Sequence, residues 1–510
     1  MHRCLKVSEI LNRVADGLQR AEAYRFALAC KTFLEPGLDE VWREIRSFDP
    51  LIACLPTDLW SEEASSTQRR LVVVLELCRD LTCEDLRRYL TYYAPRIRTI
   101  SFGWSGKRIP SVEGFRALEL VTDFQPGALS PRLKEFQWFN AVLAYHYFEK
   151  AHSKFLASSM FLFLGGSVEI LKVTTAHGVA DSILHKASIN LSIRRLATNL
   201  KQLTVFGEKD IRHCFDSLSW PSLRAVLMTD APISSIPRLA TLPCLERLEI
   251  NGFDDDLPPP QPPTSHGFST LRTLSIFSDS PLDLEHILRY LPPSNVIEEV
   301  ISDDWDLDFS RHELQDALVV LRKHCNPVTL TYLSLSTDLA RHREPIEPEE
   351  PDEIDLSPLY PFEKLQYLSL NFSRKAFICP DIVTKISTMW PRLQTLVLCP
   401  TYCSSHIPLI NHEDIVRLAD SLPSLRELGL QFDATRIPDA QQHKPRQASK
   451  LRTLYVGVSP ISSPSRAVVF LERNFPFLEK LDTTYGNESE VGTLYIERWK
   501  VVSEQWALES

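Results

Sequence analysis

A short leucine pattern, Leu-x-x-Leu-x-Leu, returns along most of the chain, usually just after a Pro or a Phe. The interval between successive copies ranges from 22 residues (Leu223 to Leu245) to 36 residues (Ile97 to Leu133). Recurrence on this scale is typical of stacked repeats, each of which buries one apolar face against its neighbours. The clear copies begin at Leu245, Leu271, Leu365, Leu393, Leu425 and Leu451, and weaker copies begin at Ile97, Leu133, Val168, Leu200, Leu223, Ile297, Leu330 and Leu478.

Each copy also predicts its own local structure. In Pro391–Leu398 the leucines have the spacing of a strand with one buried face, and His412–Ser421 has the spacing of a helix. Strands that alternate with helices predict an α/β fold. We therefore expect a curved solenoid with a parallel sheet on its inner face, from about Ile97 to Thr483. The leucines that should be buried in it include Leu248, Leu274, Leu368, Leu396, Leu428 and Leu454.

The repeats are irregular in two respects. A proline-rich segment near 254–267 and an acidic segment with prolines near 341–357 interrupt the pattern, and we expect both to be loop insertions. An unbroken ladder of buried asparagines is not expected, because the position eight residues after the first leucine holds other small polar residues. These residues, which could bond the loop backbone instead, are Asp279, Ser373, Thr401, Asp433 and Ser459.

Charge and composition exclude several classes of function. The formal net charge of −10 disfavours binding to nucleic acid phosphates or to anionic membranes. The chain has only 16 glycines and no glycine-rich loop of the kind that holds a nucleotide, so no cofactor is expected. No secretory signal is expected either, because the first residues lead into an amphipathic stretch. The 11 scattered cysteines suit reduced thiols, which predicts a cytoplasmic or nuclear protein.

No motif for catalysis is present in the sequence, so we expect a protein that is not an enzyme and has no catalytic residues. Four possible zinc ligands, Cys399, Cys403, His406 and His412, fall within 14 residues. Their spacing is not that of a known zinc finger, and Cys399 closes a strand of core leucines. A buried thiol without a metal is therefore the favoured interpretation.

Two further clusters have ordinary explanations. The run from Asp303 to Asp308 resembles a calcium loop only in its charge, since it lacks the central Gly and the closing Glu, and we expect a solvated loop. Aromatic residues gather between two repeats, where they would be either core residues or anchors for a protein partner. The sequence leaves both roles open for Trp138, Phe139, Tyr145, Tyr147 and Phe148.

Residues 1–48 predict a small helical domain. Apolar residues from Ile10 to Leu18 share one helical face, and a second apolar face contains Leu28 and Phe33. Pro36-Gly37 is expected to interrupt the helical pattern, which resumes around Trp42. Residues 49–94 are expected to form a helical linker to the solenoid, which would occupy residues 95–510.

This first segment resembles an F-box over about 40 residues, through Val7–Leu11, Leu28–Phe33 and Leu38–Trp42. With Leu55–Trp60 and Arg88–Arg98, the chain resembles the F-box proteins with divergent leucine-rich repeats found in mushroom-forming (basidiomycete) fungi. Two positions differ from the usual F-box pattern, which has Pro where this chain has Ser8 and Phe where it has Ala15.

The resemblance implies a substrate-recognition subunit of a Skp–cullin–F-box ubiquitin ligase, a component of the ubiquitin conjugation pathway. The F-box would bind the Skp-type adaptor of the cullin complex, and the repeats would bind a target protein. The alternative, which the two altered positions suggest, is a ligase-independent scaffold with a drifted F-box. The resemblance assigns adaptor binding to Val7, Ile10, Leu11, Val14, Leu28, Phe33 and Trp42.

Overall fold

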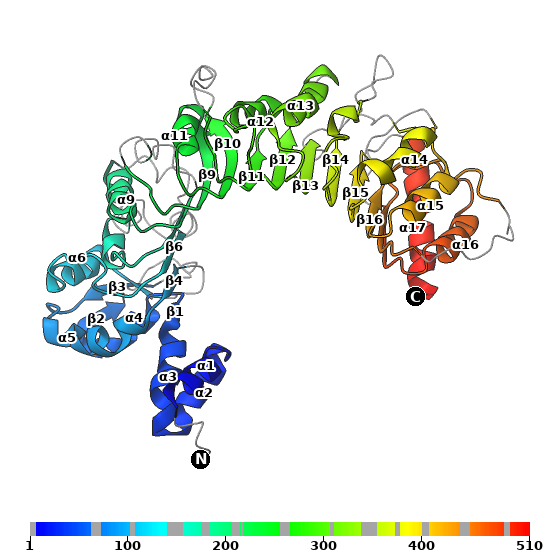
Figure 1. Cartoon of the computed structure of the whole chain (residues 1–510). Coiled ribbons are helices and arrows are strands. Elements are labelled where there is room, and N and C mark those ends of the chain that lie inside the picture. The colour runs from blue at the N-terminus through cyan, green and yellow to red at the C-terminus, as the bar shows by residue number, and fades with distance from the viewer. Residues whose placement is uncertain are drawn as a thin grey trace. The chain divides into compact units, whose positions relative to one another are not determined.

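Parallel strands alternate with helices along much of the chain (Figure 1). The computed structural model describes residues 7–62, 73–102, 108–139, 157–174, 183–206, 215, 218–254, 266–305, 311–337, 354–372, 378–399, 407–438, 449–483 and 490–509. The chain divides into two compact units. One consists of Met1–Leu245 with Asp254–Leu257, and the other of Glu246–Phe253 with Pro258–Ser510.

The first unit begins with three helices and continues into a parallel sheet. Its strands are hydrogen-bonded in the order β1-β4-β6-β7-β8-β9. The helical elements are α1 (Ser8–Ala15), α2 (Arg20–Ala29), α3 (Lys31–Arg43), α4 (Asp49–Cys54), η2 (Thr57–Leu59), α5 (Cys83–Arg88), η3 (Tyr89–Tyr93), η4 (Ala94–Arg96), α6 (Val112–Val121), η5 (Ala157–Leu162), α9 (Ile183–Leu196), η7 (Ile233–Ser235) and α11 (Ile236–Ala240). The strands of this sheet are β1 (Glu44–Ile45), β4 (Thr99–Phe102), β6 (Glu135–Phe139), β7 (Ile170–Thr174), β8 (Gln202–Phe206) and β9 (Ala225–Pro232).

The second unit alternates strands with helices at most of its connections. Its strands lie side by side in chain order, all parallel, from β10 to β18. They are β10 (Arg247–Asp254), β11 (Thr273–Phe277), β12 (Glu299–Trp305), β13 (Tyr332–Thr337), β14 (Tyr367–Asn371), β15 (Thr395–Leu398), β16 (Glu427–Gly429), β17 (Thr453–Tyr455) and β18 (Lys480–Asp482). The helices are α12 (Pro281–Leu288), α13 (Arg311–His324), η8 (Ser357–Leu359), α14 (Pro380–Met389), α15 (His412–Ser421), α16 (Pro464–Asn474) and α17 (Glu490–Glu509).

The repeating leucines form the core, as the sequence predicts. The middle leucine of each copy pairs in register with that of the next, for example Leu368 with Leu396 and Leu396 with Leu428. All six leucines expected to be buried have no exposed surface. Backbone bonds join each repeat to the next, since the Gln394 carbonyl accepts from the N–H groups of Arg426 and Glu427. The α/β repeat fold and its parallel sheet are therefore confirmed.

The sheet begins earlier than expected. β1 follows α3 without any intervening residue, inside the segment assigned to the helical domain, and pairs with Thr99 and Ile100 of β4. The segment 49–94, predicted to be a helical linker, contains α4, η2, α5 and η3 but is not helical throughout. This stretch contains β2 (Trp60–Glu62) and β3 (Val73–Leu77), which pair antiparallel, and β3 also pairs with β5 (Arg108–Pro110). Adjacent valines favour a strand here, because β-branched side chains pack well on a pleated surface.

Pro36-Gly37 does not interrupt the helix, which corrects another prediction. α3 continues through both residues. A side chain at Gly37 would place its Cβ only 2.7 Å from Ala27 Cβ and 2.8 Å from Ala27 Cα. Because real Cβ atoms do not approach so closely, the glycine is what allows α2 and α3 to pack against each other. Tertiary packing thus overrides the helix-breaking tendency of this pair.

Two buried polar side chains, Ser459 and Asn295, form hydrogen bonds to the backbone of a neighbouring repeat. Ser459, one of the small polar residues predicted to bond loop backbone, accepts from the Phe432 N–H at 3.0 Å and donates to the Val456 carbonyl at 2.6 Å. Asn295, which the sequence did not single out, is fully buried and donates to the His324 carbonyl at 2.8 Å. Of the two predicted insertions, residues 255–265 and 338–353 lie outside the described residues.

Candidate protein-binding surfaces

The three N-terminal helices form a unit with a small interior. Leu11 and Ala15 of α1 are buried, as are Ala23 and Ala27 of α2. Small side chains at these positions let the helices approach closely, which is why so short a segment can pack. Phe26 of α2 stacks on Phe33 of α3 with ring centroids 4.5 Å apart. We refer to α1, α2 and α3 as the helical unit.

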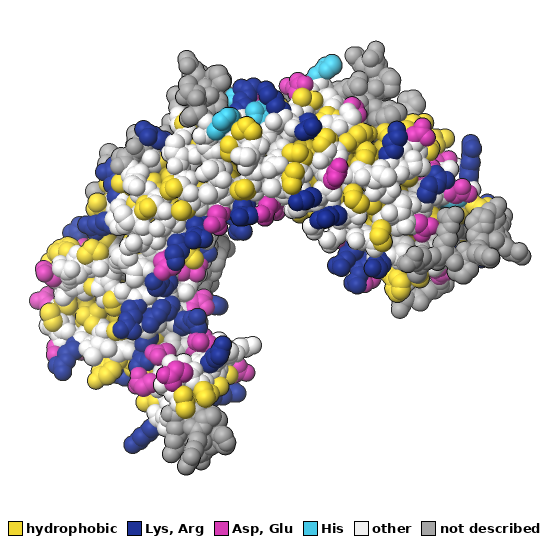
Figure 2. Space-filling view, viewed as in Figure 1, with side chains coloured by type: hydrophobic (Ala, Val, Ile, Leu, Met, Phe, Trp, Pro, Cys, Tyr) yellow, Lys and Arg dark blue, Asp and Glu magenta, His cyan; other side chains and the backbone are white. Residues whose placement is uncertain are grey.

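The helical unit exposes several apolar side chains. Val7 is 42% exposed, Ile10 40%, Val14 43% and Leu28 65%. Ile10 and Val14 are four residues apart in α1 and share a face of it, and Val7 is the residue directly before the helix. Figure 2 shows hydrophobic side chains on this unit, at the lower end of the view. Two further apolar residues of the same unit, Tyr24 and Leu34, are exposed although the resemblance does not assign them to adaptor binding. We call Val7, Ile10, Val14, Tyr24, Leu28 and Leu34 the apolar face.

The other three residues that the resemblance assigns to adaptor binding contact the chain itself. Leu11 is 2% exposed and belongs to the interior of the helical unit. Phe33 stacks on Phe26, and Trp42 stacks on Tyr93 with ring centroids 4.3 Å apart. The helical period alone could not separate Leu11 from Ile10 and Val14, because residues about 100° apart on one helix fall within the same broad apolar face and only packing decides which is buried.

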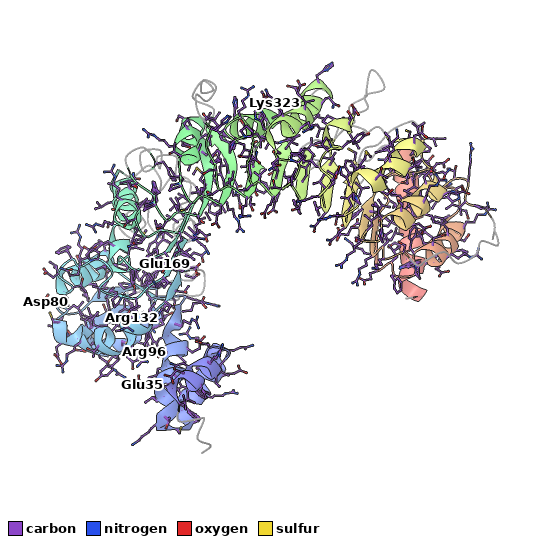
Figure 3. The ribbon with its side chains drawn as sticks, viewed as in Figure 1. Glu35, Asp80, Arg96, Arg132, Glu169 and Lys323 are labelled. Atoms are coloured by element: carbon purple, nitrogen blue, oxygen red, sulfur yellow. The ribbon has the colours of Figure 1, made fainter. Side chains whose placement is uncertain are left out.

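Ion pairs and aromatic contacts join the helical unit to the sheet of the first unit. Arg96 pairs with Glu35 and with Asp39, both on α3, and its side chain is only 13% exposed (Figure 3). The Arg98 N–H donates to the Arg43 carbonyl at 2.9 Å, where α3 becomes β1. Trp42 also meets Tyr89 edge-on, with ring centroids 6.4 Å apart. These contacts fix the helical unit against the start of the sheet.

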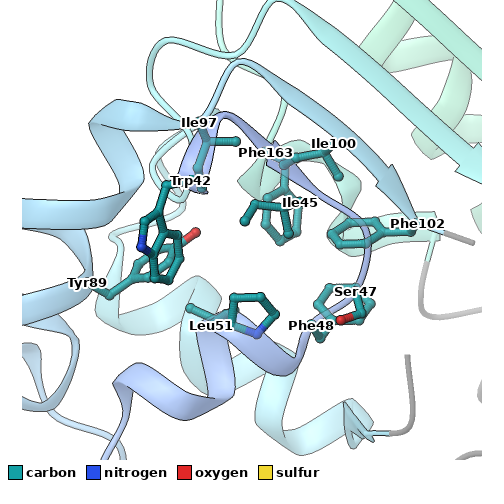
Figure 4. A pocket seen from close by; sticks show the side chains of 11 residues that line it. Trp42, Ile45, Ser47, Phe48, Leu51, Tyr89, Ile97, Ile100, Phe102 and Phe163 are labelled. Carbon is teal, nitrogen blue, oxygen red and sulfur yellow. The ribbon is translucent and has the colours of Figure 1, made fainter. Parts of the chain in front are cut away.

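A cavity at this junction is too small to hold a ligand. Its volume is about 10 Å³, which barely suffices for one water molecule (Figure 4). Its walls are almost entirely apolar, so a water there would lack partners. The Tyr89 hydroxyl donates to the Leu129 carbonyl at 2.8 Å instead, and burial raises the pKa of Tyr89. The residues around the cavity are Trp42, Ile45, Ser47, Phe48, Pro50, Leu51, Tyr89, Ile97, Ile100, Phe102 and Phe163.

The second unit presents a different surface, the face of its strands that turns away from the helices. Figure 1 shows α12 and α13 on one side of β11, β12 and β13. Side chains alternate along a strand, so the residues between the buried leucines point to the opposite side. Tyr332 of β13 and Tyr367 of β14 are among these residues. Their rings are parallel within 7°, with ring centroids 4.0 Å apart. We call this side of β11–β14 the open strand face.

The acidic run that begins at Asp303 is partly a strand, which corrects the expectation of a solvated loop. Asp303, Asp304 and Trp305 close β12, and Trp305 is fully buried against Phe372. The indole anchors the end of the strand, while Asp303 remains on the open strand face. Residues 306–310 lie outside the described residues.

The possible zinc ligands are only partly described. Cys399 is buried at the end of β15, and His412 is buried as the first residue of α15, with its ring edge-on to Phe470. Burial lowers the pKa of His412. Cys403 and His406 lie outside the described residues. Within the described ranges, no three His, Cys, Asp or Glu side chains are close enough to share a metal ion.

We predict that purified protein holds no stoichiometric zinc on Cys399 and His412, because both are buried and burial favours the neutral thiol and the neutral imidazole. Elemental analysis of the full chain checks this. One zinc per chain that disappears in both Cys399→Ser and His412→Ala would contradict the prediction, whereas zinc that survives both substitutions is bound elsewhere.

Of the aromatic cluster between two repeats, Trp138 is 2% exposed and belongs to the core, where it stacks on Phe136. Phe139 is the last residue of β6. Tyr145, Tyr147 and Phe148 lie outside the described residues.

No helix in the described part of the chain has both the length and the apolar character to cross a bilayer.

Comparison with known proteins gives little further information. No protein-family model matches the chain, and no curated protein has a similar sequence. Among solved structures, the chain resembles one in the crystal structure of the Rad7 and Elc1 complex in yeast, with 13% sequence identity and a TM-score of 0.37. The alignment covers 82% of this chain and 91% of that chain. A similarity at this level carries no information about what the chain binds.

Proposed function

We propose that the chain is a non-catalytic substrate-recognition subunit of a Skp–cullin–F-box ubiquitin ligase. In this proposal the helical unit binds a Skp-type adaptor and the repeats bind a target protein, in the cytoplasm or nucleus. The observation that carries it is the apolar face of the helical unit, at the positions where the sequence resembles an F-box. The proposed domains are this helical unit and the repeat solenoid that follows it.

The apolar face has the properties of a helix-docking surface. Amphipathic helices commonly lay exposed apolar side chains into a groove of a partner protein. Val7, Ile10 and Val14 are each about two-fifths exposed. Full burial of an exposed side chain of this kind contributes roughly 1.5–3 kcal/mol, so burying the remaining exposed part contributes about 0.6–1.2 kcal/mol each. A few such anchors are enough to hold two proteins together.

The chain would act by proximity rather than by chemistry. A target held on the repeats is brought close to the ubiquitin-charged enzyme that the adaptor and cullin recruit, which raises its effective concentration there. The contacts between Trp42 and Tyr93, and between Arg96 and α3, support this role because they hold the helical unit against the sheet.

Ile10→Asp should abolish adaptor binding in a pull-down with a purified Skp-type adaptor. The substitution places a carboxylate where an apolar side chain would be buried at the interface. Asn12→Asp is the matched control, since it adds the same charge to an exposed polar position of the same helix. Leu11 is not suitable for this test, because it is part of the unit's own interior. Equal adaptor binding by both variants would rule out the apolar face as the docking surface.

The alternative is a protein-interaction scaffold that binds no ligase, and Ser8 and Ala15 favour it. Ser8 is exposed at the first position of α1, where proline is well tolerated, so Ser8→Pro should leave the helix intact. Ala15 is 2% exposed, and a larger side chain there would overpack the interior. If wild-type protein fails to bind the adaptor and Ser8→Pro does not restore binding, the scaffold function replaces the ligase function.

A further inference from the structure

The open strand face, on β11–β14, carries carboxylates but no Lys or Arg side chain. Its facing positions on β11, β13 and β14 are neutral and include Thr273, Ser275, Ser334, Ser336 and Ser369. On β12, between them, it carries two carboxylates, Glu299 and Asp303. Within the described ranges neither pairs with Lys or Arg, since Glu299 accepts from the Thr273 hydroxyl at 3.3 Å and Asp303 from the Ser336 hydroxyl at 3.0 Å.

A pair of aromatic rings lies beside Glu299. Glu299, Tyr332 and Tyr367 are register partners on three successive strands. The rings of Tyr332 and Tyr367 face each other, so the second face of the Tyr332 ring looks toward the strand that carries Glu299. Both tyrosines are partly exposed. Adjacent strands are about 4.8 Å apart, so a group that stacks on the Tyr332 ring would be within reach of the Glu299 side chain.

The surroundings of these groups favour a cation. Burial raises the pKa of Asp303, so this carboxylate lacks the stabilisation that a positive charge would give it. Burial also raises the pKa of Tyr332, with smaller contributions from Tyr367, Glu299 and Asp303. Guanidinium groups stack on tyrosine rings and donate paired hydrogen bonds to carboxylates, whereas an ammonium ion is a compact charge.

We propose that the open strand face binds an extended, arginine-bearing segment of a target protein, with one guanidinium on Tyr332 and Glu299 and a second basic side chain on Asp303. Glu299 and Asp303 are four residues apart on one strand, which corresponds to about 13 Å. An extended segment that runs along β12 therefore matches them with basic residues at positions i and i+4. This inference rests on the proposed function, in which the repeats bind the target protein.

The experiment measures fluorescence anisotropy of labelled peptides with the full chain. The probe has eleven residues, a Gly-Ser background and arginines at positions 4 and 8. One comparison peptide carries citrulline, which has the same shape without charge, at both positions. Another has arginines at positions 4 and 7, which point to opposite sides of an extended chain. We expect the first peptide to bind at least roughly tenfold more tightly than either comparison peptide, because charge-assisted hydrogen bonds would be lost.

Protein variants locate the binding. Glu299→Gln and Asp303→Asn should each weaken binding of the arginine probe roughly tenfold. Glu298→Gln is the matched control, since Glu298 is the adjacent carboxylate, is exposed and pairs with Arg272, and binding should not change. Circular dichroism of each variant verifies folding. Equal binding of the citrulline probe, unchanged binding by Glu299→Gln and Asp303→Asn, or no binding of any probe would overturn the inference.

The same measurement separates this inference from the proposed function. The Ile10→Asp variant should bind the arginine probe as wild type does, because the helical unit takes no part in that contact. Probe binding without adaptor binding supports the strand-face inference and the scaffold function. Adaptor binding without probe binding overturns the inference alone.

Discussion

Leu368→Ala should lower the free energy of unfolding of the repeat sheet by roughly 2–5 kcal/mol. Leu368 has no exposed surface and lies in register between Leu333 and Leu396 of the neighbouring strands. Removing its side chain leaves a cavity that two repeats share, and the surrounding strands can close it only partly. Denaturant unfolding followed by circular dichroism measures the change.

Ser369→Ala is the control for this substitution. Ser369 is the next residue of β14, on the open strand face, and its side chain is partly exposed. A substitution there should change stability by less than about 0.5 kcal/mol. If the two variants unfold at the same denaturant concentration, the leucine ladder does not form the core and the register of the repeats is incorrect.

Gly37→Ala should destabilise the helical unit and thereby abolish adaptor binding. In an open helix this exchange stabilises by roughly 0.5–1 kcal/mol, because alanine is the better helix former. Here the new Cβ would lie 2.7–2.8 Å from Ala27, including its backbone, so α2 and α3 must move apart. Overpacking of this kind costs roughly 1–3 kcal/mol and therefore outweighs the helical gain.

Limited proteolysis measures this effect, with cleavage expected in residues 7–43 of the variant and the later repeats intact. Gly17→Ala is the matched control, since the nearest atom to its new Cβ is the Val14 carbonyl oxygen at 3.8 Å. Gly37→Ala protein that resists protease as well as the control would mean that α2 and α3 do not pack as closely as described.

The sequence predicted those parts of the fold whose determinants are local. Leucines at strand spacing identified the buried ladder, and the helix His412–Ser421 begins and ends where it was expected. That helix has a strong signal at its start, since the Asn411 side chain accepts from the N–H groups of Glu413 and Asp414. Local rules sufficed here because each repeat is one short unit packed on its neighbours.

The parts that the sequence did not predict depend on distant partners. β1 has only two residues and no pattern, and it exists because Thr99 and Ile100 supply its hydrogen bonds. The helix across Pro36 persists because Ala27 lies against Gly37. The same holds for the candidate surfaces. Exposure of Ile10 and burial of Leu11 depend on how α1 sits on α3, and the pairing of Tyr332 with Tyr367 depends on strand register.

The direct passage from α3 to β1 has a consequence for insertions and for engineering. One residue added between Arg43 and Glu44 would rotate the helix by about 100° relative to the strand, or exchange the two faces of the strand. The number of residues between α3 and β1 therefore sets the direction of the apolar face relative to the sheet. Insertions or deletions between Arg43 and Glu44 should be poorly tolerated. A chimera that moves the helical unit onto another repeat protein must carry Glu44, Ile45 and their β4 partner with it, since a cut after Arg43 would leave the unit without an orientation.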